Sequence, residues 1–124
     1  MELAILLSTY NGMNYLEEQV SSLLAQTYTD WKLYIRDDAS TDNTLALIHE
    51  LAKRDSRIIV IPSSRNLGAK EGFMWMLRNV EADYYMFCDH DDVWLPRKVE
   101  LTLKRMQEVV TGVDESTGIA KKKM

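Results

Sequence analysis

The chain has 124 residues, of which 46% are hydrophobic and 27% are charged, and its formal net charge is −4 at pH 7. These values describe one globular domain of ordinary size and exclude a disordered chain, and the acidic balance argues against a nucleic-acid partner. A single cysteine, Cys88, excludes an internal disulfide bond and a zinc site built from several cysteines, and no apolar run is long enough to cross a bilayer.

Four apolar runs alternate with four amphipathic stretches along residues 1–110. The apolar runs predict strands at residues 3–7, 31–35, 57–61 and 83–88. Apolar residues at helical spacing predict helices at residues 14–26, 42–54, 73–80 and 96–110. The alternation predicts a Rossmann-like three-layer α/β/α fold with a mainly parallel sheet.

Residues 111–124 have a different composition, with no apolar periodicity, two glycines and a run of three lysines near the end. We expect a disordered tail there, which leaves residues 1–110 as the domain. Binding of nucleic acid or acidic lipid by the three lysines is a weaker alternative.

Parallel sheets of this kind bind ligands at the carboxyl ends of their strands. The segments after the four predicted strands are therefore where chemistry is expected, and they hold most of the unusual polar residues of the chain. These segments are residues 8–11, 37–41, 62–68 and 89–94.

The densest acidic feature is residues 89–92 (DHDD), called here the acidic segment. Asp89, Asp91 and Asp92 repel one another, and a hard divalent cation such as Mg²⁺ or Mn²⁺ would relieve that repulsion. We interpret His90 as a spacer or hydrogen-bond donor, because such cations prefer oxygen ligands. The alternative is an acidic loop whose charge favours the dipole of the helix that follows.

The carboxylates after the second strand have two interpretations. Asp38 can accept a hydrogen bond from the imide N–H of uracil or thymine, or the pair formed by Asp37 and Asp38 can serve in helix capping, a role for which Ser40 and Asp42 are also candidates.

Three other side chains near the strand ends could contact a nucleotide. Tyr10 can stack on a base or pack on the sheet edge. Arg65 and Lys70 can neutralise a diphosphate or remain surface charges. Neither a GxxxxGK[ST] loop nor a GxGxxG loop is present, so a bound diphosphate would need a metal and basic side chains.

Four motifs follow the four predicted strands in order: Thr9-Tyr10-Asn11, residues 37–42 (DDASTD), Asn66-Leu67-Gly68 and residues 88–96 (CDHDDVWLP). In this order and spacing residues 1–110 resemble glycosyltransferase family 2, whose members have a GT-A fold and use nucleotide sugars. The last motif is most similar to the DQDDxWLP form of bacterial polysaccharide enzymes, including rhamnosyltransferases.

The resemblance implies roles for particular residues. Ser8, Thr9, Tyr10 and Asn11 would line the nucleotide pocket, and Asp38 would read the base. Asp91 would lie near the ribose and the donor phosphates. Asp92, Asp91 and Asp89 would bind Mn²⁺ or Mg²⁺, and Arg65 or Lys70 would assist with the phosphates.

The implied function is transfer from a UDP- or dTDP-sugar to a glycan acceptor, in the cytoplasm or at the inner face of the membrane. The catalytic carboxylate of inverting family members lies further along than the last motif here. We therefore expect donor binding, with little or no transfer by this chain alone, and self-association through an open sheet edge.

Two alternatives remain to this interpretation. The first is a non-catalytic nucleotide-binding or interaction domain of the same fold. The second is a receiver-like signalling domain, but such domains usually carry their acid pair after the first strand, whereas here the pairs follow the second and fourth strands.

Overall fold

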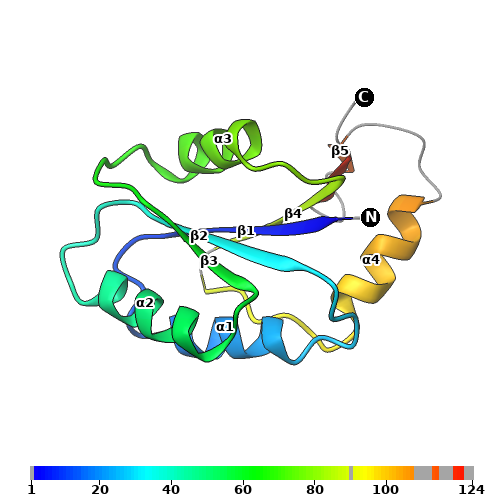
Figure 1. The fold of residues 1–124 in the computed structure, drawn as a ribbon, viewed down its shortest axis with the longest axis horizontal. Coiled ribbons are helices and arrows are strands. Elements are labelled where there is room, and N and C mark those ends of the chain that lie inside the picture. The colour runs from blue at the N-terminus through cyan, green and yellow to red at the C-terminus, as the bar shows by residue number, and fades with distance from the viewer. Residues whose placement is uncertain (1, 90, 108–112, 115–118, 122–124) are drawn as a thin grey trace.

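A computed structural model gives the structure of residues 2–89, 91–107, 113–114 and 119–121 (Figure 1). Its first part consists of four strand–helix units, which confirms the predicted alternation. Their bounds are β1 (Leu3–Thr9), α1 (Leu16–Leu24), β2 (Lys32–Asp37), α2 (Thr44–Arg54), β3 (Ile58–Ile61), α3 (Ala69–Asn79), β4 (Tyr84–Cys88) and α4 (Lys98–Gln107).

The four strands of these units form a parallel sheet in the order β3-β2-β1-β4. Leu7 of β1 lies between Ile35 of β2 and Cys88 of β4. Because all four strands run in the same direction, their carboxyl ends meet at one edge of the sheet. The predicted Rossmann-like α/β/α fold with a mainly parallel sheet is confirmed.

The two faces of the sheet are covered unequally, with α3 on one face and α1, α2 and α4 on the other (Figure 1). On the three-helix face, Leu16, Ile48 and Val99 pack on alternate residues of the strands. On the other face, Met76 of α3 packs on Leu6 and its neighbours. Every residue of β1 is buried, as expected for a central strand of a parallel sheet with helices on both sides.

Two short strands, β5 (Val113–Asp114) and β6 (Ile119–Lys121), lie where a disordered tail was expected. β6 pairs antiparallel with β4, so that Met86 lies opposite Ile119, and β5 pairs with β6. For these residues the tail prediction is wrong, and the edge of β4 is not open between Tyr84 and Met86. Strands of two and three residues carry too little periodicity to be predicted. The rest of residues 108–124 lies outside the described residues.

Among the described residues, no helix has the length and apolar character needed to cross a bilayer.

Candidate functional site

The segments that follow β1, β2 and β3 are joined at the carboxyl edge of the sheet by hydrogen bonds. We call residues 8–12, 37–44 and 65–68 the loop network. The backbone N–H of Asp38 donates to the carbonyl of Thr9 over 2.8 Å, and the amide of Asn66 donates to the carbonyl of Asp38 over 3.1 Å. The predicted gathering of polar residues at this edge is therefore present.

Asp38 is the most extensively bonded carboxylate of the loop network. Its Oδ1 accepts hydrogen bonds from Arg36 Nη1 and from the Leu67 N–H, both at 2.7 Å, and its Oδ2 accepts one from the Gly68 N–H at 3.0 Å. Arg36 also donates to the carbonyl of Arg65 at 2.9 Å. A buried ion pair thus ties the end of β2 to the loop that precedes α3.

The pKa of Asp38 is lowered from its ordinary value. Burial by itself would raise this pKa, but the hydrogen bonds from Leu67, Arg36 and Gly68 and the positive charge of Arg36 outweigh burial. The carboxylate is therefore charged at neutral pH, as a group that accepts a base N–H needs to be. Arg36 is not among the predicted site residues, although residues spaced by two along extended backbone, such as Arg36 and Asp38, point to the same face.

Asp37 and Thr9 hold the loop network together from inside. The Thr9 hydroxyl donates to Asp37 Oδ1 at 2.8 Å, and the Ser40 hydroxyl donates to the same atom at 2.6 Å. The Ser40 N–H donates to Asp37 Oδ2 at 2.9 Å. Thr9 is only 1% exposed, so its hydroxyl supports the loop from below.

Asn11 joins the first and second loops. Its Oδ1 accepts a hydrogen bond from the Thr41 N–H at 2.9 Å, and its own N–H donates to Ser40 Oγ at 2.8 Å. Its φ of 48° is a left-handed conformation that asparagine tolerates. Asp42 accepts a hydrogen bond from the Thr44 N–H at the start of α2, which confirms the capping role considered for it.

Ser8 and Tyr10 occupy different depths. Ser8 is buried against α3, where a Cβ atom on Gly72 would lie 3.1 Å from the Ser8 hydroxyl. Tyr10 is 48% exposed at the rim of the loops. Of the residues predicted in the first loop, Tyr10 is therefore the best placed to contact a ligand.

The predicted basic residues, Arg65 and Lys70, are exposed at the same edge. Arg65 belongs to the loop after β3, and Lys70 lies in the first turn of α3. A hollow of about 270 Å³ opens beside this loop, lined by Arg36, Pro62, Ser63, Ser64, Arg65, Leu67 and Trp75. It offers positive charge close to the buried Asp38.

The acidic segment follows β4 at the same edge, with Asp89, Asp91 and Asp92 exposed. The Asp92 N–H donates to the carbonyl of Asp89 at 3.3 Å, and Asp91 has a φ of 59°. His90, predicted as a spacer, lies outside the described residues.

Within the part of the chain that the structure describes, no three His, Cys, Asp or Glu side chains form a group that could hold a metal ion. The three carboxylates therefore do not form a ready-made cage. Exposed carboxylate oxygens nevertheless fit a cation that takes one or two protein ligands together with substrate phosphates.

Cys88 lies beneath the acidic segment and is completely buried. Burial raises the pKa of its thiol to about 12, and the negative charge of Asp92 adds to this effect. A protonated, buried thiol is a poor nucleophile. Cys88 therefore packs as a small apolar residue.

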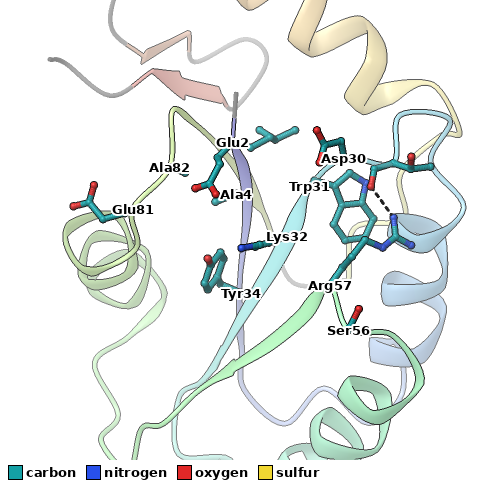
Figure 2. Close-up of a pocket in the computed structure, with 12 residues that line it drawn as sticks. Glu2, Ala4, Asp30, Trp31, Lys32, Tyr34, Ser56, Arg57, Glu81 and Ala82 are labelled. Carbon is teal, nitrogen blue, oxygen red and sulfur yellow. Dashed lines mark hydrogen bonds between the residues drawn. The ribbon is translucent and has the colours of Figure 1, made fainter.

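A cavity of about 250 Å³ lies at the opposite end of the sheet, near the starts of the strands (Figure 2). The Arg57 guanidinium lies 4.1 Å from the centre of the Trp31 ring there, and it pairs with Asp55. The charged lining residues of this cavity are of both signs, namely Glu2, Asp30, Lys32, Arg57 and Glu81. None of the predicted site residues lines it, and we assign it no role in the chemistry of the carboxyl edge.

A parallel α/β sheet with polar loops at the carboxyl ends of its strands belongs to a class of folds that bind ligands at that edge. The sequence profile described as Glycosyl transferase family 2 matches residues 4–118. The chain belongs to glycosyltransferase family 2.

Curated relatives match over most of this chain. The dTDP-rhamnosyl transferase RfbG of Shigella flexneri is 36% identical over 99 residues, which cover 76% of this chain and 34% of RfbG. The UDP-Glc:alpha-D-GlcNAc-diphosphoundecaprenol beta-1,3-glucosyltransferase WfgD of Escherichia coli is 32% identical over 103 residues, which cover 83% of this chain and 40% of WfgD. The chain thus spans well under half the length of these relatives.

Solved structures show the same fold. The mannosyltransferase PcManGT of Pyrobaculum calidifontis, in complex with GDP-Man and Mn²⁺, superimposes with a TM-score of 0.80 at 20% identity, over 89% of this chain and 33% of PcManGT. Residues 1–349 of S. aureus TarS, in complex with UDP, superimpose with a TM-score of 0.76 at 22% identity, over 93% of this chain and 37% of that chain. These similarities confirm the predicted GT-A type of fold.

Proposed function

We propose that this chain forms the donor-binding part of a glycosyltransferase that uses a UDP- or dTDP-sugar to extend a cell-surface glycan. The observation that carries the proposal is the meeting of two chemically different regions at one sheet edge. The loop network offers a charged, buried Asp38, and the acidic segment offers exposed carboxylates. The name of the relative RfbG describes a dTDP-sugar donor and that of WfgD a UDP-sugar donor, which supports these two donor classes.

In this proposal, the loop network recognises the base of the donor nucleotide. A carboxylate has about four lone-pair sites, and Asp38 uses three of them on Arg36, Leu67 and Gly68. One site is left for the imide N–H of uracil or thymine. Tyr10, exposed at the rim, supplies a face for stacking.

In the same proposal, the acidic segment and the basic residues near it bind the diphosphate of the donor. Asp92, Asp91 and Asp89 would hold Mn²⁺ or Mg²⁺ together with the donor phosphates, and such an ion stabilises the charge of a departing nucleoside diphosphate. PcManGT, which has this fold, is known with Mn²⁺ and a nucleotide sugar. Arg65 and Lys70 would add positive charge from the loop after β3 and from α3.

The acceptor in this proposal is a glycan. The name of the relative WfgD describes a lipid-linked acceptor, alpha-D-GlcNAc-diphosphoundecaprenol. An acceptor of that class would bring the reaction to the inner face of the membrane. Because little or no transfer is expected of this chain alone, donor binding without transfer agrees with both this proposal and the alternative of a non-catalytic nucleotide-binding domain, whereas transfer of the sugar by this chain would exclude that alternative.

Calorimetric titration tests the proposal. UDP and dTDP are titrated into the chain with and without Mn²⁺, and the series is repeated with Asp92→Ala and with Asp30→Asn. Asp30 is an exposed carboxylate at the opposite end of the sheet and serves as the matched control. We expect binding that depends on Mn²⁺, is lost in Asp92→Ala and is kept in Asp30→Asn. Failure of wild type to bind either nucleotide would overturn the proposal.

A further inference from the structure

The side of α1 that faces the segment leading from β4 to α4 carries Gln19 and Ser22, and Gln26 lies on the same side two residues beyond the end of the helix. Gln19, Ser22 and Gln26 are spaced by three and four residues and therefore share a face. Both glutamines are fully or almost fully buried. We call these three residues the polar stripe. The helical spacing in the sequence predicts only the apolar side of this helix.

Gln26 contacts the far end of the segment. Its Nε2 donates to the carbonyl of Leu95 at 2.8 Å, and its Oε1 accepts from the N–H of Val99 at 3.0 Å. Val99 lies in the first turn of α4, where backbone N–H groups have no partner within the helix. A single side chain thus fixes the end of the loop and the start of the helix.

Ser22 contacts the middle of the segment. Its Oγ accepts from the N–H of Trp94 at 3.0 Å and donates to the carbonyl of Gln19 at 2.7 Å. Just beyond the stripe, the Thr27 N–H donates to the carbonyl of Pro96 at 2.9 Å.

Gln19 contacts the start of the segment. Its Nε2 donates to the carbonyl of Asp89 and lies 3.4 Å from Cys88 Sγ. Its Oε1 is buried and has no hydrogen-bond partner among the described residues. The amide cannot rotate to relieve this, because the Asp89 carbonyl can only accept. An apolar side chain would avoid that unfavourable burial, so we infer that the contact with Asp89 is what Gln19 contributes.

We propose that the polar stripe positions the acidic segment for binding of the donor diphosphate and its cation. The inference rests on the proposed function of that segment. Among the described residues, the hydrogen bonds between the stripe and the segment beyond β4 all go to backbone atoms, at Asp89 on one side and at Trp94, Leu95 and Val99 on the other. The chain is thus held on both sides of Asp91 and Asp92, and the carboxylates of the acidic segment stay exposed. Gln19, Ser22 and Gln26 are thus positioning residues.

The test compares Gln26→Met and Ser22→Ala with a matched control on the other face of the sheet. Tyr85→Phe removes a hydroxyl that donates to the Val80 carbonyl at 2.6 Å and accepts from the Ala82 N–H at 3.1 Å. It lowers stability through lost buried hydrogen bonds, as Gln26→Met does, but far from the acidic segment. Ser22→Thr keeps a hydroxyl and serves as the rescue variant.

Two readouts are taken at a temperature at which all variants are folded. Hydrogen exchange reports whether the amides of Trp94 and Val99 lose protection while those of β1 keep it. Calorimetry reports the affinity of the UDP-bound chain for Mn²⁺. We expect faster exchange in Gln26→Met and Ser22→Ala and a roughly tenfold loss of Mn²⁺ affinity, a typical effect of removing groups that support metal ligands. Tyr85→Phe and Ser22→Thr keep both properties.

Each contrary outcome decides a different question. Unchanged protection in Gln26→Met and Ser22→Ala overturns the claim that the stripe holds the segment. Lost protection with wild-type Mn²⁺ affinity overturns the positioning role. A wild-type chain that does not bind UDP with Mn²⁺ overturns the proposed function and the positioning role with it, while the exchange data still decide whether the stripe holds the segment.

Discussion

The loop network and the acidic segment lie at the same edge of the sheet but are stabilised in opposite ways. In the loop network, charged and polar side chains bond to one another and to the backbone, with Asp38 bonded to Arg36 and Asp37 bonded to Thr9 and Ser40. In the acidic segment, the carboxylates are exposed, and the hydrogen bonds from α1 go to the backbone. The side chains of the first region therefore contribute to folding, whereas those described in the second are exposed to solvent.

The largest expected effect is on the buried ion pair. Arg36→Met leaves Asp38 charged and buried, and we expect the free energy of unfolding to fall by about 3–5 kcal/mol. Urea unfolding at neutral pH measures this change. The matched control is Arg54→Met, which breaks an exposed pair with Glu17 and should cost less than about 1 kcal/mol. Equal effects of the two substitutions would contradict the structural role of the buried pair.

The second prediction concerns pH. Asp38→Asn should lower the free energy of unfolding by about 2–3 kcal/mol at pH 7. The folded state lowers the pKa of Asp38 below its ordinary value near 3.8, so its stabilising effect is fully present above that value and is lost as the pH falls through the folded pKa. The difference between wild type and Asp38→Asn should therefore shrink below about pH 4. Unfolding curves from pH 7 to pH 2 test this, and a constant difference would refute it.

A smaller effect is expected at Gly68, which donates its N–H to Asp38. Gly68 has a φ of 83°, and a Cβ atom there would meet nothing within 4 Å. Because its ψ is 160°, Gly68 lies in a region of backbone conformation that essentially only glycine adopts, and the cost of Gly68→Ala is backbone strain alone, about 1–3 kcal/mol. Gly68→Asn should cost about as much, because asparagine tolerates a positive φ in the left-handed helical region and not at this ψ. Thermal unfolding of the two variants compares them directly.

The smallest effect on stability is expected in the acidic segment. Asp92→Asn should change the free energy of unfolding by less than about 0.5 kcal/mol, as for other exposed side chains. The same substitution should remove the binding of UDP that depends on Mn²⁺. A large loss of stability would show that the acidic segment, like the loop network, depends on its side chains for folding.

The main elements of the fold were predictable because each buried strand is a continuous apolar run, such as LAILL in β1, and each helix has an apolar stripe. β5 and β6 were not predictable, since their order depends on pairing with β4 and with each other rather than on a local pattern. Strand pairing over such a distance leaves no periodic signal in so few residues.

The place of the site was predictable from topology, because polar residues follow the buried strands. The internal bonding of the site was not. The sequence predicts Thr9 in a nucleotide pocket and Asp37 in helix capping, whereas the structure buries the two as hydrogen-bond partners of each other. The polar stripe of α1 contacts residues about 70 positions away, and no local rule connects glutamines on a helix with the backbone of a distant loop.

The polar stripe bonds to backbone atoms of the described residues between β4 and α4, and this has a consequence for sequence variation. Side chains at exposed positions such as Val93 and Leu95 can be replaced without removing any hydrogen bond that Gln19, Ser22 or Gln26 makes with the backbone. A mutant library over these positions should therefore retain the path of the chain while the chemistry of its surface changes. Relatives can then differ in donor preference, and variants with a new preference can be selected in the laboratory, while the backbone between β4 and α4 keeps its path.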